Sequence, residues 1–456
     1  MGSRKLARRT VLRAFTAGLT GLAGASLLAS CGATPAPATA PEGAATTEPV
    51  QQTSGGPTGE KFKIELLVEY PQEFVDWAKQ NLEPKIQEEY PVSEVVYVPI
   101  DWGTLNEKLL TTRAAGTMPD IVRGGSGGPA GYVEGDFIIP VDDYVAQWPE
   151  QADFFEASWQ GVVWEGKQWG IPMLGGPRHW AYRSDITDEE GVTIPDDWDW
   201  DDYMEAAIAL TVFEGNKIVR KGSSTGHDEM EWTGLLYSAG GSLFKDGRAN
   251  FVSDEGIWAL EWMAKRRNEV APAGMAPLES MEIPYFAMGL EVIGYGHPGL
   301  LGYNVLQYAP DKIDFVAVPQ PPINKTRVAL VSTDWDAISK TCRHPDAAWR
   351  YMTLQASVEA MTVAQEAFGG FPPTRRGVLE VAEYCKRADV IKVSENLDKF
   401  GLTYPTVPKA SLLRRKILLA ECEAACLGVK TAEQALTDAA AEWDKELEAM
   451  GWSATW

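Results

Sequence analysis

The feature that most constrains the fold of this sequence is an alternation of strand-like and helix-like runs near the start of its folded part. The apolar runs Phe62–Val68, Glu94–Ile100 and Pro119–Val122 are typical of strands. A helical spacing of apolar residues lies between the first two runs, and Trp102–Ala115 has helical character between the second and the third. Strand, helix, strand, helix, strand in this order is typical of a mostly parallel sheet, so we expect an α/β fold.

Polar side chains directly follow two of these strands. Glu69 and Tyr70 end the first strand, and Arg123 and Ser126 lie in the glycine-rich segment after the third. Ligands of such sheets bind beyond the carboxyl ends of the strands, where the connecting loops converge. These four residues are therefore the first candidates for ligand contacts.

The first thirty residues have the pattern of a bacterial export signal. Residues 1–13 hold five basic side chains and no acid, and residues 14–29 are apolar or small. This apolar run is shorter than the roughly 20 residues that a membrane-spanning helix needs. The segment around Arg8 and Arg9 resembles a twin-arginine signal, although the general secretory route stays open. Leu28–Cys31 resembles a lipobox, so we expect a signal peptide over residues 1–30 and a lipid on Cys31. A transmembrane anchor with an incidental cysteine is the alternative.

Residues 31–60 have the composition of a tether. They are mostly Pro, Ala, Thr, Gly and Ser, which bury too little surface to offset the entropy of ordering. We expect a disordered leash between the lipid and a body that works outside the cytoplasm, at the cell surface or in the periplasm. The remaining chain, from about Lys61 to Trp456, exceeds the roughly 250–300 residues at which a single core stops growing. Two lobes are therefore expected.

The charge balance restricts the ligand. The formal net charge is −23, and loss of the five basic signal residues leaves 36 basic against 64 acidic side chains. So acidic a surface argues against nucleic-acid binding, which needs a basic footprint, and disfavours a polyanionic ligand.

Four cysteines remain beside Cys31. We expect Cys342, Cys385, Cys422 and Cys426 to be buried free thiols, with a bridge from Cys385 to Cys422 or Cys426 as the alternative. No CxxC pair or paired histidines accompany them, so no metal site is expected.

Farther along, short motifs occur in a specific order. They are Pro119–Ile121, Pro140–Tyr144, Trp164–Pro172, Trp180–Tyr182, Gly240–Gly241, Asp246–Gly247, Phe286–Met288, Glu291–Gly294, Val318–Pro319, Ala347–Trp349 and Gly370–Pro373. Each motif is weak alone. In this order, behind a lipobox, they resemble the family 1 extracellular solute-binding proteins of ATP-binding-cassette importers, the group that includes maltose-binding protein. The resemblance covers nearly all of residues 61–450.

The resemblance implies a two-lobed α/β fold of the type II periplasmic-binding-protein class, with a ligand cleft between the lobes. By that analogy lobe 1 holds residues 61–174 and 318–366, and lobe 2 holds residues 175–317 and 367–456. The chain would cross between them near Pro172–Gly176, Val316–Pro319 and Glu366–Pro372, where Gly and Pro suit a hinge. The implied function is capture of a carbohydrate and its delivery to a membrane permease, by a monomer without cofactor or chemistry of its own.

Sugar recognition needs aromatic faces and planar polar groups that form paired hydrogen bonds with hydroxyls. Beside the four residues named above, the candidate ligand contacts are Arg178, Trp180, Asp228, Trp232, Tyr295, His297, Asp334, Trp335 and Tyr404. We favour Trp335, because it lies between two acids in a run of small residues that indicates a loop. The segment Arg123–Gly128 lacks the aromatic or polar contact that the family often places there. This departure indicates a roomy subsite or direct use of backbone N–H groups.

Enzyme motifs do not fit their required context. Gly124–Gly128 and Gly222–Gly226 match Gly-x-Ser-x-Gly, but a nucleophile elbow needs a helix directly after the serine, and the first match runs into Gly128 and Pro129. Gly294–Gly299 matches a dinucleotide fingerprint but contains a proline. We expect no catalysis. The alternatives are a binding protein for a peptide, a polyamine or glycerol phosphate, and a lipid-anchored carbohydrate-active enzyme.

Overall fold

The computed structural model describes residues 59–101, 103–195, 198–226, 228–278, 284–296, 315–318, 327–369 and 371–452. The predicted signal peptide, Cys31, nearly all of the tether and the candidate His297 lie outside the described residues.

The first sheet begins with the strand–helix alternation that the sequence predicts. β1 (Phe62–Val68) pairs in parallel with β2 (Val92–Pro99) and with β3 (Ile121–Gly124). The predicted strands are thus confirmed within about two residues at each end. Ile64 and Leu66 of β1 are fully buried and pack in the core beneath the sheet.

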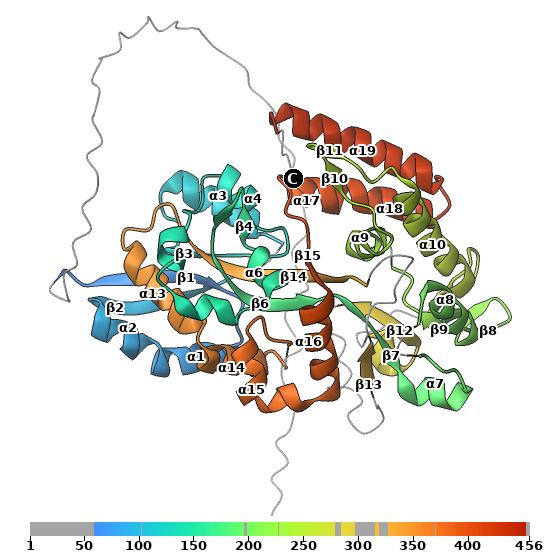
Figure 1. The fold of residues 1–456 in the computed structure, drawn as a ribbon, viewed down its shortest axis with the longest axis horizontal. Coiled ribbons are helices and arrows are strands. Elements are labelled where there is room, and N and C mark those ends of the chain that lie inside the picture. Colours follow the sequence, from blue (N-terminus) through green and yellow to red (C-terminus); the bar gives the residue numbers. More distant parts are fainter. Residues whose placement is uncertain are drawn as a thin grey trace, which may run out of the picture. The chain divides into compact units, whose positions relative to one another are not determined.

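A long strand, β14 (Ala329–Ile338), joins this sheet from far along the chain (Figure 1). It pairs antiparallel with β3 and with β6 (Ile171–Pro177), and in parallel with β15 (Gly401–Thr403). Eight of its ten residues are buried. The sheet is therefore mixed, and β14 connects three segments that are distant in the sequence.

The second sheet has the strand order β13–β7–β12–β9–β8. β7 (His179–Arg183) pairs antiparallel with β12 (Glu291–Gly296) and with β13 (Phe315–Val318). β12 pairs in parallel with β9 (Lys217–Ser223), which forms an antiparallel ladder with β8 (Val212–Glu214).

Helices and two small hairpins connect the strands. The α-helices are α1 (Gln72–Asn81), α2 (Glu83–Glu89), α3 (Leu105–Ala115), α4 (Ala130–Glu134), α5 (Asp142–Val145), α6 (Glu156–Gln160), α7 (Ser184–Glu190), α8 (Trp200–Ala209), α9 (Glu229–Ser238), α10 (Asp254–Val270), α11 (Tyr285–Met288), α13 (Pro345–Gln355), α14 (Val358–Ala367), α15 (Arg376–Val381), α16 (Ala388–Phe400), α17 (Ala410–Leu412), α18 (Leu419–Cys426) and α19 (Ala432–Ala449). The remaining elements are the 3₁₀ helices η1 (Pro149–Asp153) and η2 (Glu383–Lys386), the π-helix η3 (Leu413–Leu418), and the hairpins β4–β5 (Val163–Trp164, Lys167–Gln168) and β10–β11 (Phe244–Lys245, Arg248–Ala249).

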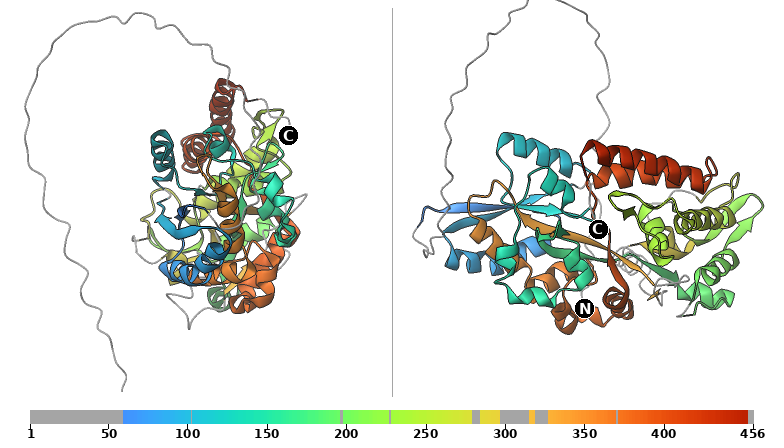
Figure 2. Two further views of the ribbon diagram at one scale, coloured as in Figure 1. Left: turned by 90° about the vertical axis from the view of Figure 1, so that its left-hand side faces the viewer. Right: turned by 45° about the horizontal axis from the view of Figure 1, so that its top comes forward.

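Each sheet has its own large core. Buried side chains of α1, α13 and α14, such as Phe74 and Tyr351, pack with those of the first sheet. The second core contains Trp198, Tyr203 and Trp443 and includes the C-terminal helices. α18 and α19 lie alongside α10, as both views of Figure 2 show. The C-terminal helices thus belong to the second core, although the strand that precedes them belongs to the first sheet.

The chain changes from one sheet to the other at three places. The first change lies at Arg178, between β6 and β7, and the second lies between β13 and β14. The third lies between β15 and η3, because η3 already packs in the second core. The residues of α15 and α16 contact the first core and the first sheet, and α16 also contacts β13 of the second sheet.

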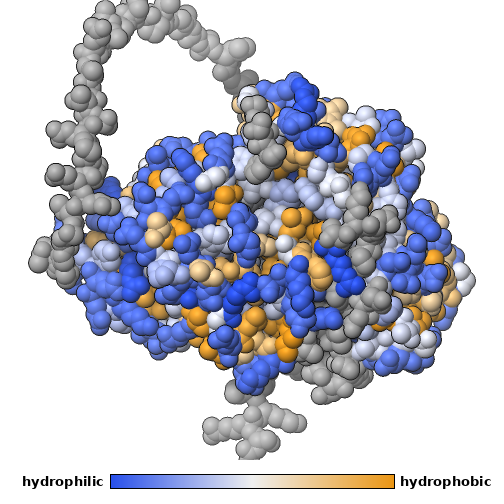
Figure 3. All heavy atoms as spheres, viewed as in Figure 1, coloured by the Kyte–Doolittle hydropathy of each residue, from blue (hydrophilic) through white to orange (hydrophobic). Residues whose placement is uncertain are grey.

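The surface and the cysteines complete the fold. The face drawn in Figure 3 is largely hydrophilic, with scattered apolar residues. No helix in the described ranges is both long enough and apolar enough to span a membrane. Cys342, Cys385, Cys422 and Cys426 are free, and all but the partly exposed Cys342 are buried.

Candidate functional site

The first group of candidate residues surrounds a buried arginine at the carboxyl end of β3. Arg123 has no exposed surface. Its Nε and Nη2 donate to the two carboxylate oxygens of Asp336 at 2.8 and 2.9 Å. Nη2 also donates to the Tyr70 hydroxyl at 2.9 Å, and Nη1 donates to Glu69 at 3.3 Å. A bidentate pair of this kind fixes the planes of both groups.

Burial raises the pKa of two acids of this group. Burial raises the pKa of Asp336, and the positive charge of Arg123 opposes that shift. Burial raises the pKa of Asp334 well above its usual range, and the neighbouring Glu69 carboxyl raises it further. Burial thus favours the uncharged form of Asp334. The neighbouring carboxyl groups of Glu69 and Asp334 are of a kind that exchanges hydrogen bonds with hydroxyl groups.

Trp335 does not lie on a loop, and that expectation is wrong. It is a residue of β14 and is fully buried. Its indole N–H donates to the Gly125 carbonyl at 3.1 Å, and its ring meets the Tyr132 ring edge-on at 5.0 Å between centroids. With no exposed surface, the ring has no face for a sugar in this conformation.

The glycine-rich segment after β3 makes room for packing rather than for a ligand. A Cβ on Gly124 would lie 2.2 Å from the Trp335 ring, and one on Gly128 would lie 2.3 Å from the Thr406 hydroxyl. Gly128 also has a φ of +66°, which favours glycine. The expected roomy subsite is therefore occupied by side chains of the protein itself.

The second group lies between the second sheet and the start of α9. Asp228 caps α9 by accepting from the Met230 N–H at 2.8 Å. Its other oxygen lies 3.9 Å from Nη1 of Arg178, the residue at which the chain leaves the first sheet. Both side chains are partly exposed, at 36 % and 25 %. One carboxylate and one guanidinium thus lie close together, and both are accessible to solvent.

The neighbouring acid Glu229 is buried. Burial raises its pKa to about 7; Arg414 opposes this shift, while a hydrogen bond with Asp228 adds to it. Burial also acts to raise the pKa of Asp228, but the hydrogen bond with Glu229 and the charge of Arg178 bring it below its usual value. Burial thus favours the uncharged form of Glu229, while Asp228 is the stronger acid of the two.

Two candidate aromatic residues hold buried polar atoms that form no hydrogen bond. Trp180 and Tyr295 face each other across the β7–β12 ladder, with ring centroids 4.6 Å apart. Within the described ranges, neither the indole Nε1 of Trp180 nor the Tyr295 hydroxyl has a hydrogen-bond partner. Burial raises the pKa of Tyr295 well above its usual value, and Asp228 adds to this, so the hydroxyl stays protonated. Buried polar atoms without partners are rare in native proteins and call for an explanation.

Three further candidates have other surroundings. Trp232 is fully buried in the second core, where its indole N–H donates to the Gly256 carbonyl at 3.1 Å. Tyr404 is buried beneath the guanidinium of Arg414. Ser126 is partly exposed, and its carbonyl accepts from Arg414 at 3.0 Å. These residues take part in packing, and they are not gathered with either group of partly exposed polar side chains.

The sequence did not single out two polar residues of these networks, Glu229 and Arg414. Glu229 directly follows the candidate acid Asp228, and such a pair of neighbouring carboxylates is a signal that would have indicated it. Arg414 lies 185 residues from its partner Glu229. No local pattern in the sequence predicts that contact.

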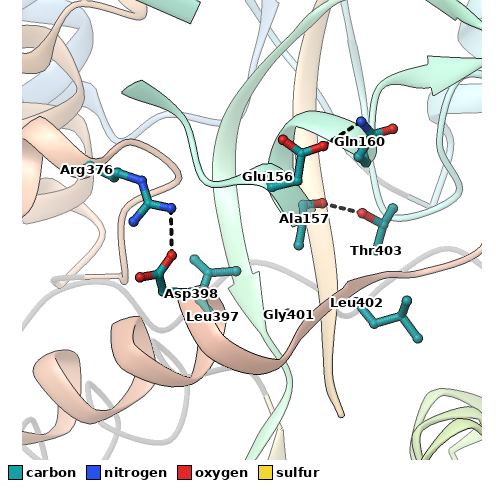
Figure 4. Close-up of a pocket in the computed structure, with 9 residues that line it drawn as sticks. All are labelled: Glu156, Ala157, Gln160, Arg376, Leu397, Asp398, Gly401, Leu402 and Thr403. Atoms are coloured by element: carbon teal, nitrogen blue, oxygen red, sulfur yellow. Dashed lines mark hydrogen bonds and ion pairs between the residues drawn. The ribbon is translucent and has the colours of Figure 1, made fainter. Parts of the chain in front are cut away.

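A separate cavity of about 270 Å³ lies between α6, α16 and β15 (Figure 4). Arg376 and Asp398 form an ion pair of 2.6 Å at its wall, and the Thr403 hydroxyl donates to the Ala157 carbonyl. The lining consists of Glu156, Ala157, Gln160, Arg376, Leu397, Asp398, Gly401, Leu402 and Thr403. None of the candidate residues lines this cavity. In the described part of the chain, no group of three or more His, Cys, Asp or Glu side chains could hold a metal ion.

Comparison with known families finds a match to the bacterial extracellular solute-binding proteins, over residues 70–362. Two curated relatives match shorter parts of the chain. An arabinooligosaccharide-binding protein of Halalkalibacterium halodurans is 27 % identical over 192 residues, which are 38 % of this chain and 41 % of the relative. An uncharacterized lipoprotein of Streptomyces antibioticus is 24 % identical over 127 residues, 27 % of this chain and 28 % of the relative. The chain thus spans less than half the length of these relatives.

Solved structures match over far more of the chain. The sugar-binding protein MalE of Xanthomonas citri aligns with a TM-score of 0.71 at 19 % identity, covering 86 % of this chain and 98 % of that one. A solute-binding protein of Thermotoga lettingae, solved with alpha-D-tagatose, aligns with a TM-score of 0.68 at 20 % identity, covering 85 % and 100 %. At identities this low, the alignments show a shared fold and nothing more specific.

The buried ion pair of Arg123 and Asp336 is expected to stabilise the first sheet, and a substitution tests this. Asp336→Asn keeps the shape but removes the bidentate counter-charge of the buried Arg123 guanidinium, which then has only the longer contact with Glu69 at 3.3 Å. Breaking a buried pair on one side costs roughly 3–5 kcal/mol, and we expect a loss of that order in the free energy of unfolding, measured by urea denaturation. Glu94→Gln, which breaks the exposed pair of Glu94 with Lys63, is the control and should change stability little. Equal, small effects of both variants would contradict a structural role for the buried pair.

Proposed function

The chain belongs to the bacterial extracellular solute-binding proteins, and from that premise we propose that it is a lipid-anchored binding protein that captures a carbohydrate and hands it to the permease of an importer. The expected fold class, the type II periplasmic-binding-protein fold, is confirmed. Proteins of this family and fold bind substrates rather than convert them, so the chain is not an enzyme.

The observation that supports a carbohydrate most directly is the pair of donors at Trp180 and Tyr295 that have no hydrogen-bond partner among the described residues. Leaving a buried donor without a partner costs free energy. A ligand rich in hydroxyls would remove that cost by accepting from the indole and from the phenol. Asp228 and Arg178 stand nearby, partly exposed, and offer the paired polar contacts that adjacent hydroxyls need.

The first group would supply the opposite wall of such a site. Glu69 and Asp334 provide two further carboxyl groups, and burial favours the uncharged form of Asp334. We therefore propose Glu69, Asp334, Arg178, Trp180, Asp228 and Tyr295 as ligand contacts. Trp335 and Trp232 are left out because their buried indole N–H groups already donate to backbone carbonyls, and Tyr404 because its ring is buried against the Arg414 guanidinium. His297 and Ser126 stay predictions.

We also propose two lobes, each built on one sheet, with a hinge where the chain passes from one sheet to the other. Residues 376–403 are better assigned to the lobe of the first sheet than to the other lobe, because Val378 and Val390 pack in the first core and β15 pairs with β14. The last crossing would then follow Thr403, rather than lie at Glu366–Pro372.

Binding to defined compounds tests the ligand class. We expect calorimetric titration to detect binding of a neutral oligosaccharide from a panel that contains maltotetraose, mannotriose and arabino-oligosaccharides. The panel also contains spermidine, a tripeptide and glycerol 3-phosphate. Native mass spectrometry of protein purified without refolding would show any ligand that it already carries. Binding of spermidine, the tripeptide or glycerol 3-phosphate without binding of any sugar would contradict the proposal.

Tyr295→Phe separates a ligand contact from a packing role. The variant removes a hydroxyl that has no protein partner in the described part of the chain, so the free energy of unfolding should be unchanged or slightly higher. Affinity should fall by about 1.5–3 kcal/mol, roughly 10- to 150-fold, if the carbohydrate accepts from this hydroxyl. Tyr144→Phe is the control: its hydroxyl donates to Asp346 at 2.7 Å, so stability should fall while affinity stays the same. Full affinity in Tyr295→Phe would remove Tyr295 from the site.

Cys31→Ser tests the anchor. The proposal rests on the lipobox-like sequence and the tether-like segment after it. A single thioether-linked lipid anchor is lost when its cysteine is replaced, so the variant should appear in the soluble fraction after a carbonate wash of membranes. A variant that stays with the membranes would show that something other than lipid on Cys31 holds the protein there.

A further inference from the structure

One arginine contacts the segment Tyr404–Leu412, the last passage of the chain from the first sheet to the second core. β15 ends at Thr403 in the first sheet, and η3 begins at Leu413 in the second core. Arg414, in the first turn of η3, is 2 % exposed. Nine residues thus lie between the end of β15 and the start of η3, and Arg414 is the second residue of η3.

Arg414 binds three segments at once. Its Nη1 donates to the Ser126 carbonyl in the glycine-rich loop after β3, at 3.0 Å. Its Nη2 donates to a carboxylate oxygen of Glu229 at the start of α9, also at 3.0 Å. Its guanidinium lies 3.3 Å from the centroid of the Tyr404 ring, in the passage itself. Only the planar fork of an arginine can make these contacts together.

The loop and the passage fit closely around this side chain. A Cβ on Gly127 would lie 3.3 Å from the Ala410 side chain, so the two backbones approach closely. Lys409 adopts a left-handed conformation with a φ of +48°, which is uncommon for a residue other than glycine. The π-helical turn that follows is itself rare and often marks functional segments. The backbone is thus shaped so that Arg414 reaches both Ser126 and Glu229.

These contacts join the two groups of proposed ligand residues. Ser126 follows the strand end that carries Arg123, the centre of the first group. Glu229 is next to Asp228, which belongs to the second group. We propose that Arg414 is a positioning residue for solute binding, which holds the loop Gly125–Gly128 and the start of α9 at the spacing that the ligand requires.

This inference rests on the proposed function, and its test therefore has one readout that needs no ligand. Arg414→Met keeps much of the bulk and removes both hydrogen bonds. Amide hydrogen exchange in Gly125–Gly128 should become at least about tenfold faster, because the loop then opens more often. Arg248→Met removes an exposed arginine paired with Asp444 and Glu448 and should leave exchange in this loop unchanged.

The second readout is affinity for the carbohydrate found by titration. Coupling between distant parts of a protein typically amounts to roughly 5- to 150-fold in affinity, and we expect the dissociation constant of Arg414→Met to rise by roughly 10- to 100-fold. Arg414→Lys keeps the charge but reaches only one of the two acceptors. Its dissociation constant should therefore lie between those of Arg414→Met and the unmodified protein. Arg248→Met should bind as the unmodified protein does.

The outcomes separate the two proposals. Faster loop exchange together with weaker binding supports the positioning role. Unchanged exchange in Gly125–Gly128, or full affinity despite faster exchange, overturns it. If Arg414→Met does not fold, Arg414→Lys decides, since normal exchange and affinity in that variant would also overturn the role. If the unmodified protein binds no carbohydrate, the proposed function fails, and the exchange experiment still tests whether Arg414 holds the loop.

Discussion

The buried ion pair of Arg123 and Asp336 is the interaction that most strongly organises this structure. A guanidinium in the interior is tolerated only if its donors are satisfied. Asp336 accepts two of its hydrogen bonds, and Tyr70 and Glu69 accept others. The pair therefore ties β14 to β3 and to the end of β1. It also explains why polar residues occupy a strand that is otherwise buried.

The same arrangement decides where the neighbouring aromatic residue can go. With Asp336 facing Arg123, strand alternation sends Trp335 to the opposite face of β14. That face meets Gly124, where any side chain would collide with the indole. Gly124 is thus a consequence of a large ring placed against a backbone, and Gly127 and Gly128 likewise lie close to Ala410 and Thr406. The composition of the glycine-rich loop reflects packing, although it looks like an adaptation for binding.

Charge is handled alike in the two groups of proposed ligand residues. In each, burial raises the pKa of one acid of a neighbouring pair and so favours its uncharged form, and an arginine stands nearby. Such groups offer donors and acceptors with little net charge, which suits a neutral ligand with many hydroxyls better than an anion. The overall acidity of the chain therefore says less about the ligand than the local pairing does.

Signals between residues a few positions apart were enough to predict the strands β1, β2 and β3, the end of α3 at a glycine, and the family. They were also enough to name Glu69, Arg123, Asp228 and Tyr295 as polar or aromatic residues near the ends of elements. Which residues become neighbours, and which are exposed, followed only from the fold. The small and acidic residues around Trp335 favour a loop, yet pairing with β3 and β6 makes the segment a buried strand. Arg414 meets Glu229 and Ser126 only because the C-terminal helices return to the second core. The burial of these side chains, which is the main cause of the raised pKa values, arises from contacts between segments far apart in the chain, such as Asp336 with Arg123 and Arg414 with Glu229. A pattern among a few neighbouring residues does not encode such contacts.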